Sequence, residues 1–199
     1  MVRRTMGKRQ KKLVGGGIIM AFLDEGGFSS TPFIAKTWGL VGQTPVVTHP
    51  FNWDKLSVIS VITTTGKLCF RIYPGETIKA DKVVAFLRQF LKQFDGKIIL
   101  YWDGLPAHKS KKVKNFLAKH PRLQIKRLPS YSPDLNPDEG VWGYIKTREL
   151  PNLTVDSTPE LVHEVRKALR KVQHRSKLIK SFLFESELPW DEESYKFIA

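Results

Sequence analysis

Three acidic residues, Asp24, Asp103 and Glu139, stand at positions from which a fold can bring them together. The first two each follow a short apolar run, and Glu139 follows an Asn-Pro pair typical of the start of a helix. Hard divalent cations such as Mg²⁺ prefer oxygen ligands of this kind. Two such ions can stabilise both the attacking and the leaving oxygen of an in-line displacement. The three carboxylates therefore indicate two-metal chemistry if their side chains meet.

Each carboxylate also has an ordinary structural explanation. Asp24 alone would be a loop or capping residue, Asp103 begins an Asp-Gly turn, and Glu139 suits a capping box at a helix start. Only their combination, at two strand ends and one helix start, favours a shared site. Without metal, carboxylates so close together repel, which predicts a poorly ordered or partly protonated site. Of the adjoining pairs Asp24-Glu25 and Asp138-Glu139, only one member each should reach the metals, because neighbouring residues point in different directions.

Runs of apolar and β-branched residues alternate with helical patterns along the chain. The predicted strands lie at residues 18–23, 56–64, 67–73, 97–102 and 123–128. Long amphipathic helices are predicted at 78–94 and 158–178, and shorter ones from about Ser110 and from Asn136, with Asn136 as the N-cap and Pro137 first in the helix. A strand, a crossover helix and another strand imply parallel pairing. The order predicts a mixed α/β sheet with helices against it.

The charge balance indicates a polyanionic partner. The chain has 33 Lys and Arg against 19 Asp and Glu, a formal net charge of +14 and a pI near 9.9. Nucleic acid fits this excess best, although an anionic membrane surface is an alternative. The single cysteine, Cys69, excludes an intrachain disulfide and a Cys-rich zinc site. No apolar stretch is long enough to span a bilayer, so we expect no membrane insertion and an intracellular location.

A strongly basic segment follows Asp103. From Lys109 to Arg127 there are eight basic side chains and no acidic ones. Such a run is usually a solvated face, but its position after a candidate metal ligand favours contact with the DNA backbone. The expected DNA-contacting residues are Lys109, Lys111, Lys112, Lys114, Lys126 and Arg127.

Three segments resemble the DDE domain of the IS630 and Tc1/mariner transposases. They are Phe22–Glu25, Tyr101–His108 (YWDGLPAH) and Leu128–Glu139 (LPSYSPDLNPDE), and the last of them is highly specific. Asp103 and Glu139 are 36 positions apart, which resembles the family's spacing. The resemblance implies an RNase H-like mixed sheet with helices on both faces. It also implies that Asp24, Asp103 and Glu139 are catalytic and bind two Mg²⁺ ions, for which Mn²⁺ can substitute, with Asp103 bridging both.

The resemblance divides the chain into three expected parts. These are a basic arm at residues 1–16, the catalytic domain at 17–150, and a C-terminal helical extension with an acidic tail at 151–199. Family members usually carry helix-turn-helix modules before the catalytic domain, so we expect DNA-end recognition to lie on a separate polypeptide or to be lost. DNA is the implied partner, bound by a homodimer in the cytoplasm of a prokaryote.

Three further side chains near the motifs have competing interpretations. His108 could touch a phosphate or help to position a metal-bound water, or it could be a hydrogen-bonded loop histidine. Trp142 and Tyr131 are better explained as packing residues than as base-stacking residues.

Two other functions compete with a transposase. One is a DNA-binding domain without catalysis, against which the intact set of carboxylates argues. The other is an RNase H-like nuclease acting on branched DNA or RNA hybrids, against which the segment Pro129–Glu139 argues.

Overall fold

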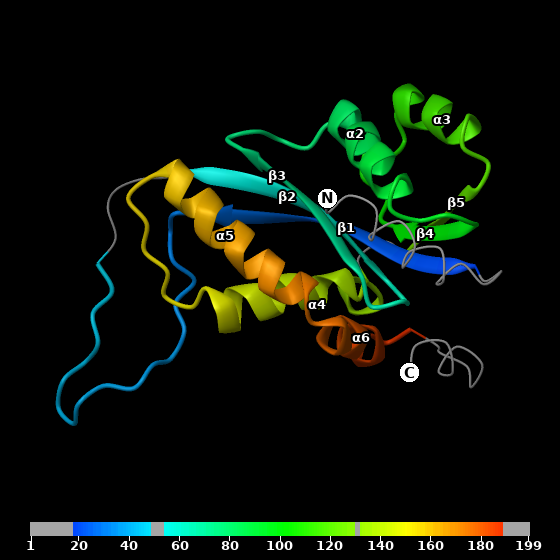
Figure 1. Cartoon of the computed structure of the whole chain (residues 1–199). Helices are drawn as coiled ribbons and strands as arrows, with labels where there is room; N and C mark the ends of the chain where they lie inside the picture. The colour runs from blue at the N-terminus through cyan, green and yellow to red at the C-terminus, as the bar shows by residue number, and fades with distance from the viewer. Residues whose placement is uncertain (1–17, 49–53, 130–131, 189–199) are drawn as a thin grey trace, which may run out of the picture.

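A computed structural model describes residues 18–48, 54–129 and 132–188 of the chain (Figure 1). The predicted basic arm, Tyr131 and most of the acidic tail lie outside these residues.

The described strands form one five-stranded mixed sheet in the order β3-β2-β1-β4-β5 (Figure 1). Strand β1 pairs antiparallel with β2 and parallel with β4, while β2–β3 is an antiparallel hairpin and β4–β5 is parallel. The strands are β1 Ile19–Ser29, β2 Lys55–Thr63, β3 Leu68–Pro74, β4 Ile98–Trp102 and β5 Leu123–Arg127. This topology is the expected mixed sheet, and β1 at its centre is the one strand with both kinds of neighbour.

Strand β1 is longer than the sequence predicts. The apolar run ends at Leu23, but the strand continues through Asp24 to Ser29 because these residues stay paired with β2, down to Ser29 opposite Lys55. The prediction that Asp24 lies at the end of the strand is therefore wrong. The parallel pairing with β4 does end early, at Phe22 opposite Tyr101, so Asp24 lies just beyond that junction.

Helices cover both faces of the sheet (Figure 1). Alternate residues of β1 explain this arrangement, because Ala21 and Leu23 enter one core and Phe22 enters the other. The first core is covered by α2 (Ala80–Leu91) and α3 (Lys111–Ala118). The second is covered by α4 (Asp138–Tyr144), α5 (Thr158–Gln173) and α6 (Ser176–Glu185).

Three helix boundaries can be compared with the predictions. Ser110 caps α3 as expected by accepting a hydrogen bond from the Val113 N–H, at 3.3 Å. Helix α4 begins at Asp138 after a helical Pro137, and the Asn136 side chain accepts from the Asp138 N–H at 3.3 Å, as an N-cap does. The prediction of a single last helix is wrong, since α5 ends at Gln173 and α6 starts at Ser176.

Helix α4 is held against β1 by Trp142. The indole is buried and meets Phe28 edge-on, with ring centroids 6.0 Å apart. It lies on the bare backbone of Gly26, where an added Cβ would be 2.7 Å from the ring atom Cδ2. This close approach is possible only because residue 26 has no side chain. The prediction that Trp142 is a packing residue is confirmed.

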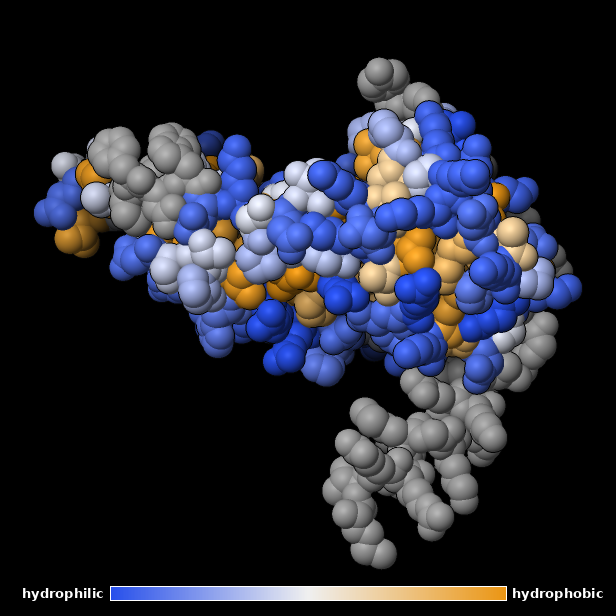
Figure 2. Space-filling view, turned by 90° about the horizontal axis from the view of Figure 1, so that it is seen from above, coloured by the Kyte–Doolittle hydropathy of each residue, from blue (hydrophilic) through white to orange (hydrophobic). Residues whose placement is uncertain are grey.

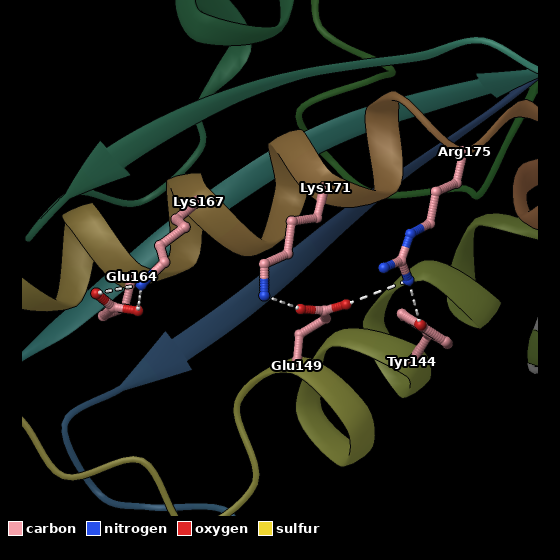
Figure 3. A network of polar contacts seen from close by, with 6 residues as sticks. All are labelled: Tyr144, Glu149, Glu164, Lys167, Lys171 and Arg175. Carbon is pink, nitrogen blue, oxygen red and sulfur yellow. Dashed lines mark hydrogen bonds and ion pairs between the residues drawn. The ribbon is translucent and has the colours of Figure 1, made fainter.

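Beyond α4 the chain continues in the π-helix η2, Ile145–Glu149, whose last residue is tied to α5 (Figure 3). The Glu149 carboxylate is 2.8 Å from the Lys171 Nζ and 3.5 Å from an Arg175 guanidinium nitrogen. The same arginine donates to the Tyr144 hydroxyl at 2.8 Å. The end of the α4–η2 segment is therefore fixed to the helix that packs across the sheet.

A long connection between β1 and β2 projects from the body of the protein (Figure 1). It carries the most exposed apolar side chains of the described residues, among them Ile34, Trp38, Leu40, Val41 and Val46. Figure 2 shows hydrophobic atoms on the surface at this end of the molecule. Among the described helices, none has the length and apolar character needed to cross a membrane.

The contact between Trp142 and Gly26 predicts a large difference between two neighbouring substitutions. Gly26→Ala forces the indole or the strand to move, and we expect a loss of about 1–3 kcal/mol of stability. Gly27→Ala is the matched control, because a Cβ there has no atom within 4 Å. Thermal unfolding should show a Tm lowered by roughly 2–4 °C per kcal/mol for Gly26→Ala only. Equal Tm values for the two variants would contradict this packing.

Candidate active site

The three predicted carboxylates line one cavity of about 380 Å³ at the edge where β1 and β4 diverge. Asp24 comes from β1, Asp103 directly follows β4, and Glu139 lies in the first turn of α4. Since Phe22 is paired with Tyr101, Asp24 and Asp103 lie two residues further along two parallel chains and share one face. The structure therefore brings the predicted residues together, and Glu139 reaches them from α4.

Burial among other carboxylates makes Asp24 hard to ionise. Its pKa is raised from 3.8 to about 8, first by burial and then by the negative charges of Glu139 and Glu25. The Trp142 Nε1–H opposes this shift by donating to Asp24 Oδ2 at 3.0 Å. Partial protonation of the site at neutral pH follows, as the sequence predicts for crowded carboxylates.

Asp138 lies beside Glu139 but points away from the cavity. It is completely buried, and the Ser60 hydroxyl of β2 donates to its Oδ2 at 2.6 Å, while Oδ1 has no hydrogen bond. Burial first, and then the charge of Asp24, raise its pKa well above the usual value. Asp138 is thus a buried, hydrogen-bonded anchor of α4. The sequence offers no signal for its pairing with Ser60.

A second group of side chains lies behind Asp103, on the opposite face of the sheet edge. His108 is 2% exposed and stacks on Trp102 of β4, with ring centroids 4.2 Å apart and planes 3° from parallel. Its Nδ1 is 2.9 Å from Asp103 Oδ1, and its Nε2 is 2.9 Å from Glu25 Oε1. The imidazole therefore joins the Asp103 carboxylate to the acidic residue next to Asp24.

The two carboxylates change the acid–base behaviour of His108. Burial alone would lower its pKa, but the hydrogen bond and charge of Glu25, with the charge of Asp103, outweigh burial and raise the pKa. The ring is a buried, hydrogen-bonded histidine, which agrees with the second of the two interpretations that the sequence left open. Its place five residues after Asp103 in the Tyr101–His108 motif was the signal that singled it out.

Two sets of side chains could hold a divalent cation. One is the set that lines the cavity, Asp24, Asp103 and Glu139, which offers oxygen ligands alone. The other is Glu25, Asp103 and His108, whose ligating atoms lie within 4.8 Å of one another in the described part of the chain. Mg²⁺ prefers oxygen ligands in a shell that keeps water and substrate phosphate, which suits the open, all-carboxylate set. Asp103 belongs to both sets.

The basic residues expected to contact DNA divide into two groups. Lys109 and Arg127 line the cavity together with the carboxylates. The Arg127 guanidinium lies over Gly104, where a Cβ would come within 2.2 Å of its terminal nitrogen. The others are exposed on α3 and β5: Lys111, Lys112, Lys114 and Lys126.

Another basic residue of this segment has a structural task. Arg122 donates to the Phe94, Gly96 and Leu91 carbonyls, at 2.7, 3.2 and 2.5 Å. Those carbonyls belong to the end of α2 and the turn after it, so Arg122 caps that helix. The eight basic residues of the run therefore do not form a single uniform DNA surface.

A mixed sheet in this strand order, with carboxylates converging from β1, β4 and a later helix, defines an RNase H-like nuclease domain. Comparison with known families agrees, because residues 19–162 match the family described as DDE superfamily endonuclease. That match covers more than two thirds of the chain. The chain belongs to the DDE superfamily endonucleases.

Solved structures with this fold include the transposase Mos1. The Mos1 mariner paired-end complexes with Mn and with Mg give TM-scores of 0.59 and 0.61 at 18% identity, over 85% and 84% of this chain. The catalytic domain of Mos1 mariner transposase gives 0.52 at 13% identity, over 92% of this chain and 89% of that domain.

This chain spans about half of the Mos1 chains in the two paired-end complexes, 56% and 52%. No curated protein sequence matches it significantly. The predicted DDE endonuclease family and the predicted RNase H-like fold are both confirmed.

The raised pKa of Asp24 predicts how stability depends on pH. The folded chain binds this proton more tightly than the unfolded chain, where the value 3.8 applies. The resulting stabilisation is complete below about pH 3.8 and is lost as the pH rises through about 8. In a buffer that contains a metal chelator, the loss of this proton should lower Tm as the pH rises from about 3.8 to about 8. The decline in Tm should be smaller in Asp24→Asn, which cannot titrate at this position. Parallel Tm profiles for the two proteins would show that Asp24 does not titrate in this way.

Proposed function

We propose that the chain is the catalytic part of a transposase, a metal-dependent DNA endonuclease and strand transferase. Water attacks a phosphodiester at the element end and leaves a 3′-hydroxyl on one fragment and a 5′-phosphate on the other. The freed 3′-hydroxyl then attacks a phosphodiester of target DNA. The observation that carries this proposal is the common cavity of Asp24, Asp103 and Glu139, which opens to solvent beside two basic side chains, Lys109 and Arg127.

The chemistry of these residues fits Mg²⁺, with Mn²⁺ as a substitute. Asp24 and Asp103 would hold the ions, with Asp103 shared between them, and Glu139 would complete one shell. Bound there, the ions would supply charge stabilisation for the attacking and leaving oxygens. The raised pKa of Asp24 supports this assignment, because a crowded and buried carboxylate gains most from a nearby cation. Solved structures of Mos1 with Mg and with Mn are consistent with it.

The residues of this chain have separate tasks in the reaction. The Trp142 N–H holds Asp24 Oδ2 in place, so one oxygen of that carboxylate stays oriented while the other remains available. The side chains of Lys109 and Arg127 would bind the phosphates on either side of the scissile bond, which places the reacting phosphorus over the carboxylates. The exposed lysines of α3 would extend this contact along the duplex.

The proposed partner is DNA, bound by a homodimer. Mos1 is seen in a paired-end complex with its left transposon end and in a strand-transfer complex. By analogy, two copies of this chain would each act on one DNA end. A helix-turn-helix polypeptide that recognises the end sequence would be a further partner.

Replacing Asp103 tests the chemistry. Asp103→Asn keeps the size of the side chain but removes a charge that metal binding needs, so cleavage of element-end DNA should fall by about 10³-fold or more. Cleavage is measured on labelled duplexes with Mg²⁺ or Mn²⁺. Asp134→Asn is a control for charge removal nearby, since Asp134 lies on the 3₁₀ turn Pro133–Leu135 and does not line the cavity. Full activity of Asp103→Asn would remove the mechanism.

Lys109 and Arg127 should contribute to DNA affinity through phosphates. In the double variant Lys109→Gln/Arg127→Gln, the slope of log K against log salt should become shallower by about 1–2, because each lost phosphate contact removes roughly 0.9. Fluorescence anisotropy with duplex DNA at several salt concentrations measures this slope. Lys92→Gln is the control, since Lys92 is exposed at the end of α2, before β4 starts. An unchanged slope in the double variant would place the DNA elsewhere.

A further inference from the structure

Next to the Asp103 carboxylate lies a group of three side chains that the proposed chemistry does not use: Trp102, His108 and Glu25. His108 bridges Asp103 and Glu25 with two contacts of 2.9 Å, and its ring lies flat on Trp102. These groups come from three places in the sequence: β1, the end of β4 and the loop after it. Their meeting therefore depends on the fold.

The polar contacts of the Asp103 carboxylate with described residues are concentrated on one of its oxygens. Oδ1 accepts from the Leu105 N–H at 3.0 Å and faces His108 Nδ1 at 2.9 Å. The ring nitrogen Nδ1 also faces the Asp103 carbonyl oxygen, at 3.4 Å. Both of these neighbours are acceptors, so the tautomer that carries a proton on Nδ1 satisfies them. Among the hydrogen bonds within the described residues, none is made to Oδ2, so Oδ2 stays available.

The other ring nitrogen of His108, Nε2, also has a carboxylate partner. Nε2 meets Glu25 Oε1, and Glu25 is itself only 13% exposed. The stacked indole of Trp102 prevents the imidazole from tilting out of its plane. A ring held at both nitrogens and along one face has a single orientation, and through it Asp103 has one as well.

We propose that His108, anchored by Glu25, is a positioning residue that orients the Asp103 carboxylate so that Oδ2 is presented to the metal ions. The inference rests on the proposed function for the identity of Asp103 as a ligand. It adds that strand β1 contributes two residues to the site. Asp24 lines the cavity on one face of the strand, and Glu25, on the other face, contacts the histidine that positions Asp103. The alternation of side chains along an extended strand makes this possible.

Direct ligation by His108 is the competing explanation, because Glu25, Asp103 and His108 also form a compact group of metal-ligating atoms. The geometry favours the positioning role. Both ring nitrogens already face carboxylate oxygens at hydrogen-bond distance, and the side chain is only 2% exposed. The cavity that holds Asp24, Asp103 and Glu139 is lined by neither His108 nor Glu25.

The test measures binding of Mn²⁺ by the full chain without DNA, by calorimetry and by electron paramagnetic resonance. His108→Ala should raise the Kd for Mn²⁺ by about 10- to 100-fold, as the loss of a residue that orients a ligand usually does. His108→Asn should recover most of that affinity, because the asparagine amide can donate from near the position of Nδ1. Glu25→Ala should weaken binding in the wild-type background but not in His108→Ala, since it acts through the ring.

His120→Ala is the matched control. His120 also stacks on an aromatic ring, that of Phe116 at 4.1 Å, and its Nδ1 contacts the Phe116 carbonyl at 2.7 Å, but it does not line the cavity. Its removal should leave the Kd for Mn²⁺ unchanged.

Two results would overturn the positioning role. One is a wild-type Kd in His108→Ala, and the other is a ¹⁴N coupling in the Mn²⁺ spectrum that disappears in that variant, which would make His108 a ligand. The proposed function fails by a different result, the absence of metal-dependent DNA cleavage by the wild-type chain. Loss of cleavage activity therefore cannot be mistaken for a failure of the positioning role.

Discussion

The packing of Trp142 on the bare backbone of Gly26 is the contact on which the geometry of the site depends. It brings α4 against β1, and with it Glu139 to a strand that lies more than a hundred residues earlier in the chain. The same indole donates its N–H to Asp24, so a single side chain joins the packing of the helix to the orientation of a ligand. The buried Asp138 accepts a hydrogen bond from Ser60 and so fixes the first turn of α4 to β2. After α4, the ion pair of Glu149 with Lys171 fixes η2 to α5.

This packing brings acidic side chains of α4 close to Asp24 of β1. Burial, and then the charges of neighbouring carboxylates, raise the pKa of Asp24 and of Asp138. On the other face of β1, the carboxylates of Glu25 and Asp103 have a partner within the protein, because the His108 ring contacts both of them. The two faces differ: the carboxylates behind the sheet edge both contact one imidazole, whereas those in the cavity face one another, and under the proposed function cations from solution would offset their charge.

Much of this arrangement could be predicted from the sequence, because apolar runs mark the strands and the carboxyl ends of parallel strands meet at one edge of the sheet. The meeting of Asp24 and Asp103 could be predicted on that basis, and the motif Leu128–Glu139 supplied the third carboxylate. The extension of β1 was missed because Glu25, Gly26 and Gly27 have low strand propensity, and only their pairing with β2 makes them a strand. The break between α5 and α6 was missed because the residues between them, His174 and Arg175, include no glycine or proline that would mark a helix end.

The bridge through His108 depends on the turn after β4 and could not be read from spacing alone, since a histidine in a loop has many possible partners. The central claim is that the cavity, and not the compact group behind it, receives the metal. The most direct measurement is anomalous diffraction from crystals of the protein with Mn²⁺. The account predicts Mn²⁺ peaks between Asp24, Asp103 and Glu139. A sole peak between Glu25 and the His108 ring, with none in the cavity, would contradict it.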